Sequence, residues 1–144
     1  RQGTCFENAV EEQLDTIIDT LETNGYDAEL RAEYTTAYND QSGQKKTVDF
    51  AIFVDGRLAV VVEANCYKGG GSKPSEIRRS YNHVASRMRT DGVEFVWVTD
   101  GQGWAKSLTN VLRQSYEDIT DVYNLHQVEH ELGDDILAYV DREY

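Results

Sequence analysis

The chain has 144 residues, 40% of them hydrophobic, and a formal net charge of −12. This length suits one compact domain over residues 1–144, and no apolar run approaches the roughly 20 residues needed to cross a bilayer. The start shows no secretory signal. Two cysteines are too few for a disulfide-rich protein, and neither lies in a C-x-x-C pair, as a zinc ribbon would require. Together with the missing apolar run, these features exclude the membrane-spanning, disulfide-rich and zinc-ribbon classes. We therefore expect a soluble, cytoplasmic protein.

The first predicted element is an amphipathic helix. Apolar residues from Phe6 to Leu21 recur at helical spacing, and Thr4 stands where an N-cap is expected, with Glu7 three residues later. Asn24-Gly25 gives the stop signal.

Three strands are predicted next. Residues 28–38 are strand-like, 39–43 form a polar turn, and 47–54 indicate a second strand. Asp55-Gly56 is a hairpin signal, and 58–63 is apolar on both faces, which is typical of a central strand.

The second half alternates helix and strand. A helix is predicted from Pro74, whose fixed φ suits a first helical turn, to about Met88. Residues 93–98 indicate a buried strand, 103–114 a helix, 122–125 a short edge strand and 134–143 a terminal helix. The pattern predicts an α/β fold.

The charge is unevenly distributed. Residues 64–90 hold six basic residues and one acid, a local charge of +5 that leaves −17 for the rest of the chain. A basic strip on an acidic protein is typical of a DNA-facing surface. The acidic remainder indicates a salt-adapted, halophilic protein, or serves only solubility.

Two carboxylates end the predicted strands in an unusual way. Asp49 is flanked by apolar residues, and Glu63 follows the apolar run 58–62. Together they offer the hard oxygen ligands that a divalent cation requires, so the first hypothesis is metal-assisted phosphodiester cleavage. The alternative is a buried salt bridge, or a carboxylate facing water. Because side chains alternate along a strand, Asn65 shares a face with Glu63.

A glycine loop and a basic helix follow these strands. Residues 69–71 let the backbone approach a ligand closely, and the N–H groups after Ser72 can hold a phosphate. Lys73, Arg78 and Arg79 would then lie within reach of a duplex. Alternatively, Arg79 pairs with a glutamate on its own helix.

These residues carry a family resemblance. Asp49 followed by Glu63-x-Asn65 resembles the PD-(D/E)xK nuclease core, with Asn where Lys is commonest. The longer string from Glu63 to Tyr81 resembles the DpnII/MboI group of type II restriction endonucleases, which recognise GATC. Similar strings occur at Phe6-Glu7, 97–104 and 123–125. The chain is shorter than a full family member and looks like its C-terminal catalytic part.

The resemblance implies a single nuclease domain with a mixed central sheet flanked by helices. It implies a Mg²⁺-dependent endonuclease that cuts double-stranded DNA at GATC and, because the site is palindromic, acts as a homodimer. Asp49 and Glu63 would bind Mg²⁺, with Glu7 as a third ligand. Asn65 would occupy the usual lysine position, and Lys73 would supply the missing charge. The DNA-binding residues would be Tyr67, Gly70, Ser72, Lys73, Arg78, Arg79 and Tyr81.

Two alternatives stay open. Because Asn65 is uncharged, the chain can be a DNA-binding module that keeps the fold but hydrolyses slowly or not at all. It can also be an α/β protein without nucleic-acid function, whose carboxylates hold a structural cation.

Overall fold

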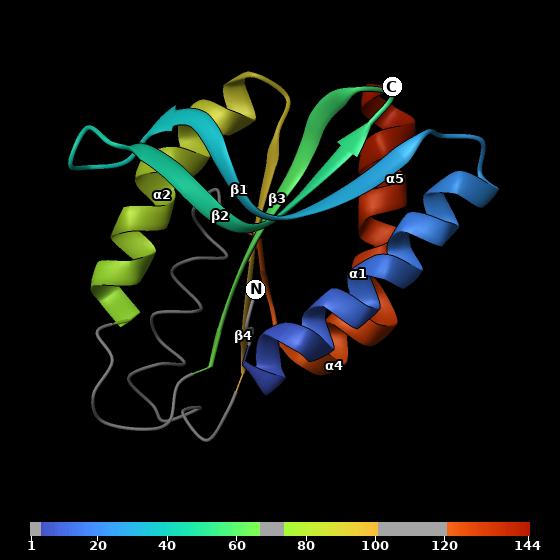
Figure 1. The fold of residues 1–144 in the computed structure, drawn as a ribbon, viewed down its shortest axis with the longest axis horizontal. Coiled ribbons are helices and arrows are strands. Elements are labelled where there is room, and N and C mark those ends of the chain that lie inside the picture. The colour runs from blue at the N-terminus through green and yellow to red at the C-terminus, as the bar shows by residue number, and fades with distance from the viewer. Residues whose placement is uncertain (1–3, 67–73, 101–120) are drawn as a thin grey trace.

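The computed structural model describes residues 4–66, 74–100 and 121–144. Its elements, in chain order (Figure 1), are α1 (Cys5–Thr23), β1 (Ala28–Asn39), β2 (Lys45–Val54), β3 (Arg57–Cys66), α2 (Pro74–Thr90), β4 (Glu94–Asp100), β5 (Asp121–Tyr123), α4 (Leu125–Gln127), the π-helical turn η1 (Val128–Leu132) and α5 (Gly133–Glu143). No helix in these ranges is long and apolar enough to cross a membrane.

The five strands form one mixed sheet in the order β1-β2-β3-β4-β5. The first three run antiparallel as a meander, and β4 and β5 join β3 in parallel. Helix α2 makes the crossover between β3 and β4, as parallel pairing requires. The predicted α/β fold with a mixed sheet flanked by helices is confirmed.

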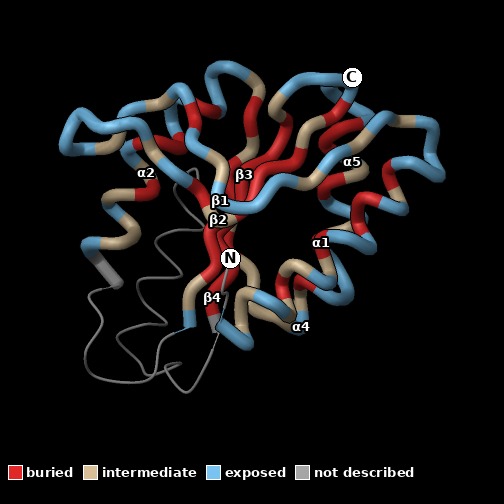
Figure 2. Tube along the Cα trace, in the orientation of Figure 1, coloured by how far each residue is buried: buried red, intermediate tan, exposed pale blue. Residues whose placement is uncertain are grey.

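Helices cover both faces of the sheet. Helices α1 and α5 lie on one side and α2 on the other (Figure 1). Two apolar clusters result: an α1-side cluster that includes Leu14, Val62 and Ile136, and an α2-side cluster that includes Val61, Met88 and Trp97. Because both faces of β3 are packed, this strand and β4 form the most continuously buried part of the chain (Figure 2).

Helix α1 forms as its sequence predicts. The Thr4 hydroxyl accepts a hydrogen bond from the Glu7 amide at 3.1 Å, and the Glu7 carboxylate reaches back to Thr4, which closes a capping box. The buried stripe Val10, Leu14, Ile17, Ile18 and Leu21 then faces the sheet. Gly25, at φ +94°, supplies the left-handed conformation just after the helix.

The C-terminal helical segment begins earlier than predicted. Helix starts at Leu125 rather than Asp134, because Asn124 and Gln127 close a second capping box with two hydrogen bonds of 2.8 Å. Strand β5 accordingly ends at Tyr123. The predicted helix at 103–114 lies outside the described residues.

The β1–β2 hairpin bends at its middle. Val48 packs in the α2-side cluster and Phe50 in the α1-side cluster, although residues two apart on a regular strand share a face. On β1, Glu33 has a left-handed φ of +50°, and in the ladder register it stands opposite Asp49. Both strands therefore change face at this point, and Asp49 lies at the change.

Candidate active site

Asp49 and Glu63 lie together where the β2–β3 ladder ends. The ladder pairs Phe50 with Val62, and the next step in that register would pair the two acidic residues. Instead, the Asp49 carboxylate accepts a hydrogen bond from the backbone N–H of Ala64 at 2.8 Å. This bond holds the Asp49 carboxylate beside Glu63 at the end of β3.

The Glu63 side chain is buried beside another charge. The residue is only 5% exposed. Burial, and then the neighbouring Asp49 carboxylate, raise the pKa of Glu63 to about 8, while Lys46 acts in the opposite direction. Lys46 does not fully compensate the buried Glu63 carboxylate beside the half-buried Asp49, so the pair favours a further cation.

The residues present fit a hard divalent cation. Glu63 Oε1 is buried, and Lys46 Nζ lies 2.6 Å from it as an ion pair. Within the described ranges, no group of three or more Asp, Glu, His and Cys side chains could hold a metal ion. A site with two carboxylates and further water or phosphate oxygens is what Mg²⁺ commonly takes.

Glu7, predicted as a third ligand, is occupied with its own helix. Its Oε1 lies 3.1 Å from the Thr4 hydroxyl and 3.4 Å from the Thr4 backbone nitrogen. The capping box explains this side chain without a metal. Its role as a ligand stays a prediction.

Asn65 is held by two aromatic residues. Its Nδ2 donates to Tyr81 Oη at 2.7 Å, and its Oδ1 accepts from Trp97 Nε1 at 3.0 Å. The amide thus ties β3 to α2 and β4. Tyr81 is 8% exposed and packs against the rings of Phe95 and Trp97, with centroids 5.2 and 5.4 Å away.

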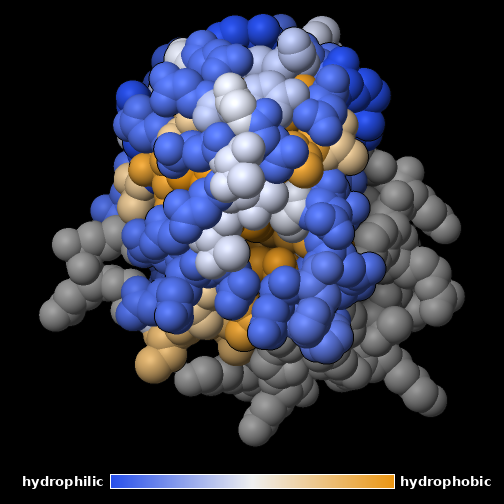
Figure 3. All heavy atoms as spheres, turned by 90° about the vertical axis from the view of Figure 1, so that its right-hand side faces the viewer, coloured by the Kyte–Doolittle hydropathy of each residue, from blue (hydrophilic) through white to orange (hydrophobic). Residues whose placement is uncertain are grey.

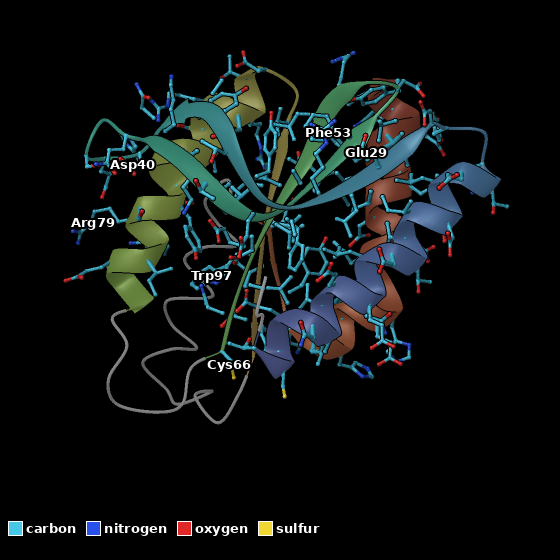
Figure 4. The ribbon with its side chains drawn as sticks, in the orientation of Figure 1. Glu29, Asp40, Phe53, Cys66, Arg79 and Trp97 are labelled. Atoms are coloured by element: carbon cyan, nitrogen blue, oxygen red, sulfur yellow. The ribbon has the colours of Figure 1, made fainter. Side chains whose placement is uncertain are left out.

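The predicted DNA-binding residues fall into three groups. Tyr81 lies in this buried aromatic cluster, and its ring is not exposed for the predicted contact with DNA. On α2, Arg78 is half-buried and Arg79 is exposed, and Arg79 extends from the side of the helix away from the sheet (Figure 4). The third group lies outside the described residues, so its contacts with DNA stay predictions; its members are Tyr67, Gly70, Ser72 and Lys73.

Lys46 is the site residue that the sequence did not reveal. It precedes Asp49 by three positions, and the strand pattern alone would put it on the face of Phe50, in the α1-side cluster. The bend at Asp49 puts it beside Glu63 instead. Its one signal in the sequence is a lysine pair, Lys45-Lys46, close to a candidate ligand.

Comparison with known proteins gives the family. The sequence matches the DpnII restriction endonuclease family over residues 1–135. It is 31% identical over 141 residues to the type II restriction enzyme DpnII of Streptococcus pneumoniae, a match that covers 92% of this chain and 48% of the relative. The type II restriction enzyme MboI of Moraxella bovis is 40% identical over 102 residues, covering 70% of this chain and 36% of the relative.

The chain therefore spans about half the length of DpnII and less of MboI. A solved structure of the MspJI restriction endonuclease with a 27-mer oligonucleotide aligns with a TM-score of 0.38 and 15% identity, over 92% of this chain and 32% of that one. That likeness is too distant to inform the site. Because the family match extends over residues 1–135, most of the sequence, the chain belongs to the DpnII restriction endonuclease family.

Proposed function

We propose that this chain is the catalytic part of a Mg²⁺-dependent type II restriction endonuclease that cuts double-stranded DNA at GATC. The observation that carries the proposal is the buried Glu63 carboxylate beside the half-buried Asp49, a pair whose negative charge Lys46 only partly compensates, in a chain of this family. GATC is the sequence that the resemblance to the DpnII/MboI group implies. Because that sequence is palindromic, we infer a homodimer with two-fold symmetry.

The reaction sets the requirements for the site. Hydrolysis forms a bond from a water oxygen to phosphorus and breaks one P–O ester bond; one water proton goes to the leaving alkoxide and the other to solvent. A bound Mg²⁺ would supply a more acidic water and stabilise the charge that develops on the phosphate. Asp49 and Glu63 would hold it.

The chain itself contributes rigidity and placement. The Ala64 amide fixes the Asp49 carboxylate, and burial fixes Glu63. Through Tyr81 and Trp97, Asn65 locks the end of β3 to its neighbours. Preorganised groups of this kind need not rearrange as charge develops, which is the main source of electrostatic catalysis.

Charge segregation supports a duplex on the α2 side. Helix α2 carries four arginines and one glutamate, whereas α1 carries six carboxylates and no basic residue. Lys and Arg gain affinity for DNA by releasing counterions from its phosphates. We therefore place the duplex against α2 and the end of the sheet that holds Asp49 and Glu63.

A plasmid-cleavage assay tests the proposal. The complete polypeptide is incubated with Mg²⁺ and DNA containing GATC, or the same DNA with each site changed to GTAC, at several salt concentrations. We expect cuts only at GATC, and none with EDTA. Asp49→Ala and Glu63→Gln should each slow cleavage by about 10²–10³-fold or more, whereas Asp15→Asn, an exposed acid on α1, should not. Wild-type cleavage by Asp49→Ala would show that the site is elsewhere.

A second candidate is a DNA-binding module with little or no hydrolysis. The uncharged Asn65, with both ends of its amide engaged, favours it. Duplex binding without cleavage in Mg²⁺, at any salt concentration, would support this alternative. Failure to bind DNA at all would contradict both candidates.

A further inference from the structure

A phosphodiesterase site needs positive charge near the scissile phosphate, and Asn65 cannot provide it. Negative charge builds on the phosphoryl oxygens in the transition state, and fixed cations that face it lower the barrier. An amide is neutral, and that of Asn65 is already bound at both ends, by Tyr81 and Trp97. Its contacts point to α2 and β4 and are those of a structural tether.

Among the residues that the structure describes, Lys46 forms an ion pair with Glu63 of the carboxylate pair. Its Nζ lies 2.6 Å from Glu63 Oε1, and its side chain is 20% exposed. The same Nζ lies 5.3 Å from the centre of the Tyr81 ring. The ammonium group is thus held between a buried carboxylate and an aromatic face, both of which favour a cation, while part of the side chain still meets solvent.

Tyr81 links Lys46 to Asn65. The face of its ring meets the Lys46 ammonium group, and its hydroxyl accepts the hydrogen bond from Asn65. The rings of Phe95 and Trp97 fix its orientation. Asn65 therefore acts on Lys46 through Tyr81, which gives this amide a positioning role.

We propose that Lys46 is the cationic catalytic residue of this site, contacting a non-bridging oxygen of the scissile phosphate, and that Asn65 positions it through Tyr81. The inference rests on the proposed function and names a residue for its missing charge. Lys46 comes from β2, and the bend at Asp49 places it where a lysine two residues after Glu63 would otherwise act. Lys73, which lies outside the described residues, is the competing cation.

A purely structural ion pair is the competing explanation of the Lys46–Glu63 contact. Breaking a buried pair leaves an uncompensated charge and destabilises the fold. A structural pair would therefore change unfolding but not the rate of cleavage by folded molecules. The two explanations differ in the chemical step, which can be measured by itself.

The test is single-turnover cleavage of a GATC duplex by the complete polypeptide, with enzyme in excess and at a temperature where circular dichroism shows each variant folded. Lys46→Met should slow the cleavage step by about 10²–10³-fold, with DNA affinity, measured without divalent cations, changed by less than tenfold. Lys46→Arg, which keeps the charge, should cleave at least tenfold faster than Lys46→Met. Lys45→Met is the matched control: it removes the same charge from the adjacent, exposed residue, which binds the Ala37 carbonyl.

Three results would overturn the inference. Lys46→Met could cleave within threefold of Lys45→Met, Lys46→Arg could be as slow as Lys46→Met, or Lys73→Met alone could lose the chemical step. Should Lys46→Met not fold, Lys46→Gln, which keeps a polar group beside Glu63, takes its place with the same expectation. A wild-type protein that cuts no DNA would instead refute the proposed function, and the role of Lys46 with it.

Discussion

A second pair of carboxylates shows what makes the Asp49–Glu63 pair special. Glu94 and Asp121 adjoin at the other end of the parallel strands, beside a cavity of about 680 Å³. There Arg89 lies 3.6 Å from Glu94 and 4.0 Å from Asp121, and the Asp121 side chain is 46% exposed. That pair lies partly in solvent, whereas Glu63 is buried, so the two pairs differ in exposure although each has a basic side chain beside it.

The Glu94 pair should make stability depend on pH. Burial, and then Asp121, raise the pKa of Glu94 to about 7, above the ordinary value of about 4.5 that applies when the chain unfolds. Between these values the folded protein holds a proton that the unfolded chain has lost, so stability should fall as pH rises from about 4.5 to about 7. Glu94→Gln, which does not titrate, should remove this part of the decline.

The measurement is the thermal midpoint of wild type and Glu94→Gln between pH 4.5 and 8, in EDTA. The difference between the two proteins isolates Glu94 from other titrating groups. Glu12→Gln, an exposed acid on α1, controls for the loss of one negative charge. A constant difference across the whole pH range would contradict the raised pKa.

At the residue scale, the sequence predicted the two carboxylates of the candidate site but not the side chains that contact them. Asp49 and Glu63 stood out because a carboxylate beside an apolar strand run is unusual, and the buried salt bridge that the sequence left open as an alternative is present at Glu63, with Lys46. Lys46 could not be, because its face depends on a bend that strict alternation does not contain. The motif position of Asn65 predicted a catalytic role. Its hydrogen bonds to Tyr81 and Trp97 could not be predicted, because these two residues are distant from it in sequence.

At the scale of elements, periodicity succeeded where apolar residues follow one regular pattern. Helix α1 and strand β3 have such patterns, and the structure confirms both. The start of the C-terminal helical segment was missed because Gly133 looks like a break. Its buried residues Val128, Leu132, Ile136 and Val140 recur every four positions, wider than the 3.6 of an α-helix. The π-helical turn widens the local repeat and keeps them facing the sheet.

The bend in β1 and β2 gives a prediction about Glu33. A left-handed φ of +50° costs a residue with a side chain about 1–2 kcal/mol relative to glycine. Glu33→Gly should therefore raise the free energy of unfolding by about 1 kcal/mol and keep cleavage intact. Glu33→Val should lower it by about 1–3 kcal/mol and slow cleavage, because a straightened hairpin would move Asp49 and Lys46.

Urea unfolding and the plasmid assay check both variants. Ala32→Gly is the control. Ala32 is the exposed residue next to Glu33 and has no positive φ, so glycine there should destabilise the strand. The same loss of stability in both glycine variants would show that Glu33 does not relieve strain.

At the scale of the molecule, the sheet separates two kinds of surface. The face over α1 and α5 is mostly hydrophilic (Figure 3), and α1 carries six carboxylates. The arginines of α2 lie across the sheet. Under the proposed function, a duplex should be repelled by the first surface and attracted by the second, so the net charge of −12 should direct DNA to one side without preventing its binding.

If Asp49 and Glu63 bind Mg²⁺ as proposed, the ion should stabilise the whole fold. A ligand that binds only the native state raises the free energy of unfolding by RT ln(1 + [L]/Kd), about 2.7 kcal/mol at one hundred times Kd. Mg²⁺ should therefore raise the thermal midpoint of the wild type by several degrees. Asp49→Asn and Glu63→Gln should remove this response, because each deletes one ligand of the proposed pair.

Glu7→Gln keeps the capping box, which accepts Gln as well as Glu, so its midpoint without Mg²⁺ should not change. A weaker Mg²⁺ response in that variant would show that Glu7 is a third ligand.

Ionic strength has to be matched in this experiment. Any salt screens the repulsion among the 26 acidic residues and raises the midpoint without occupying a site. NaCl at the same ionic strength should therefore stabilise wild type, Asp49→Asn and Glu63→Gln alike, whereas the additional rise in Mg²⁺ should belong to the wild type. Equal responses of all three proteins to both salts would mean that the carboxylate pair binds no Mg²⁺ in the absence of DNA. The phosphate oxygens of the duplex would then have to complete the site before the ion could bind.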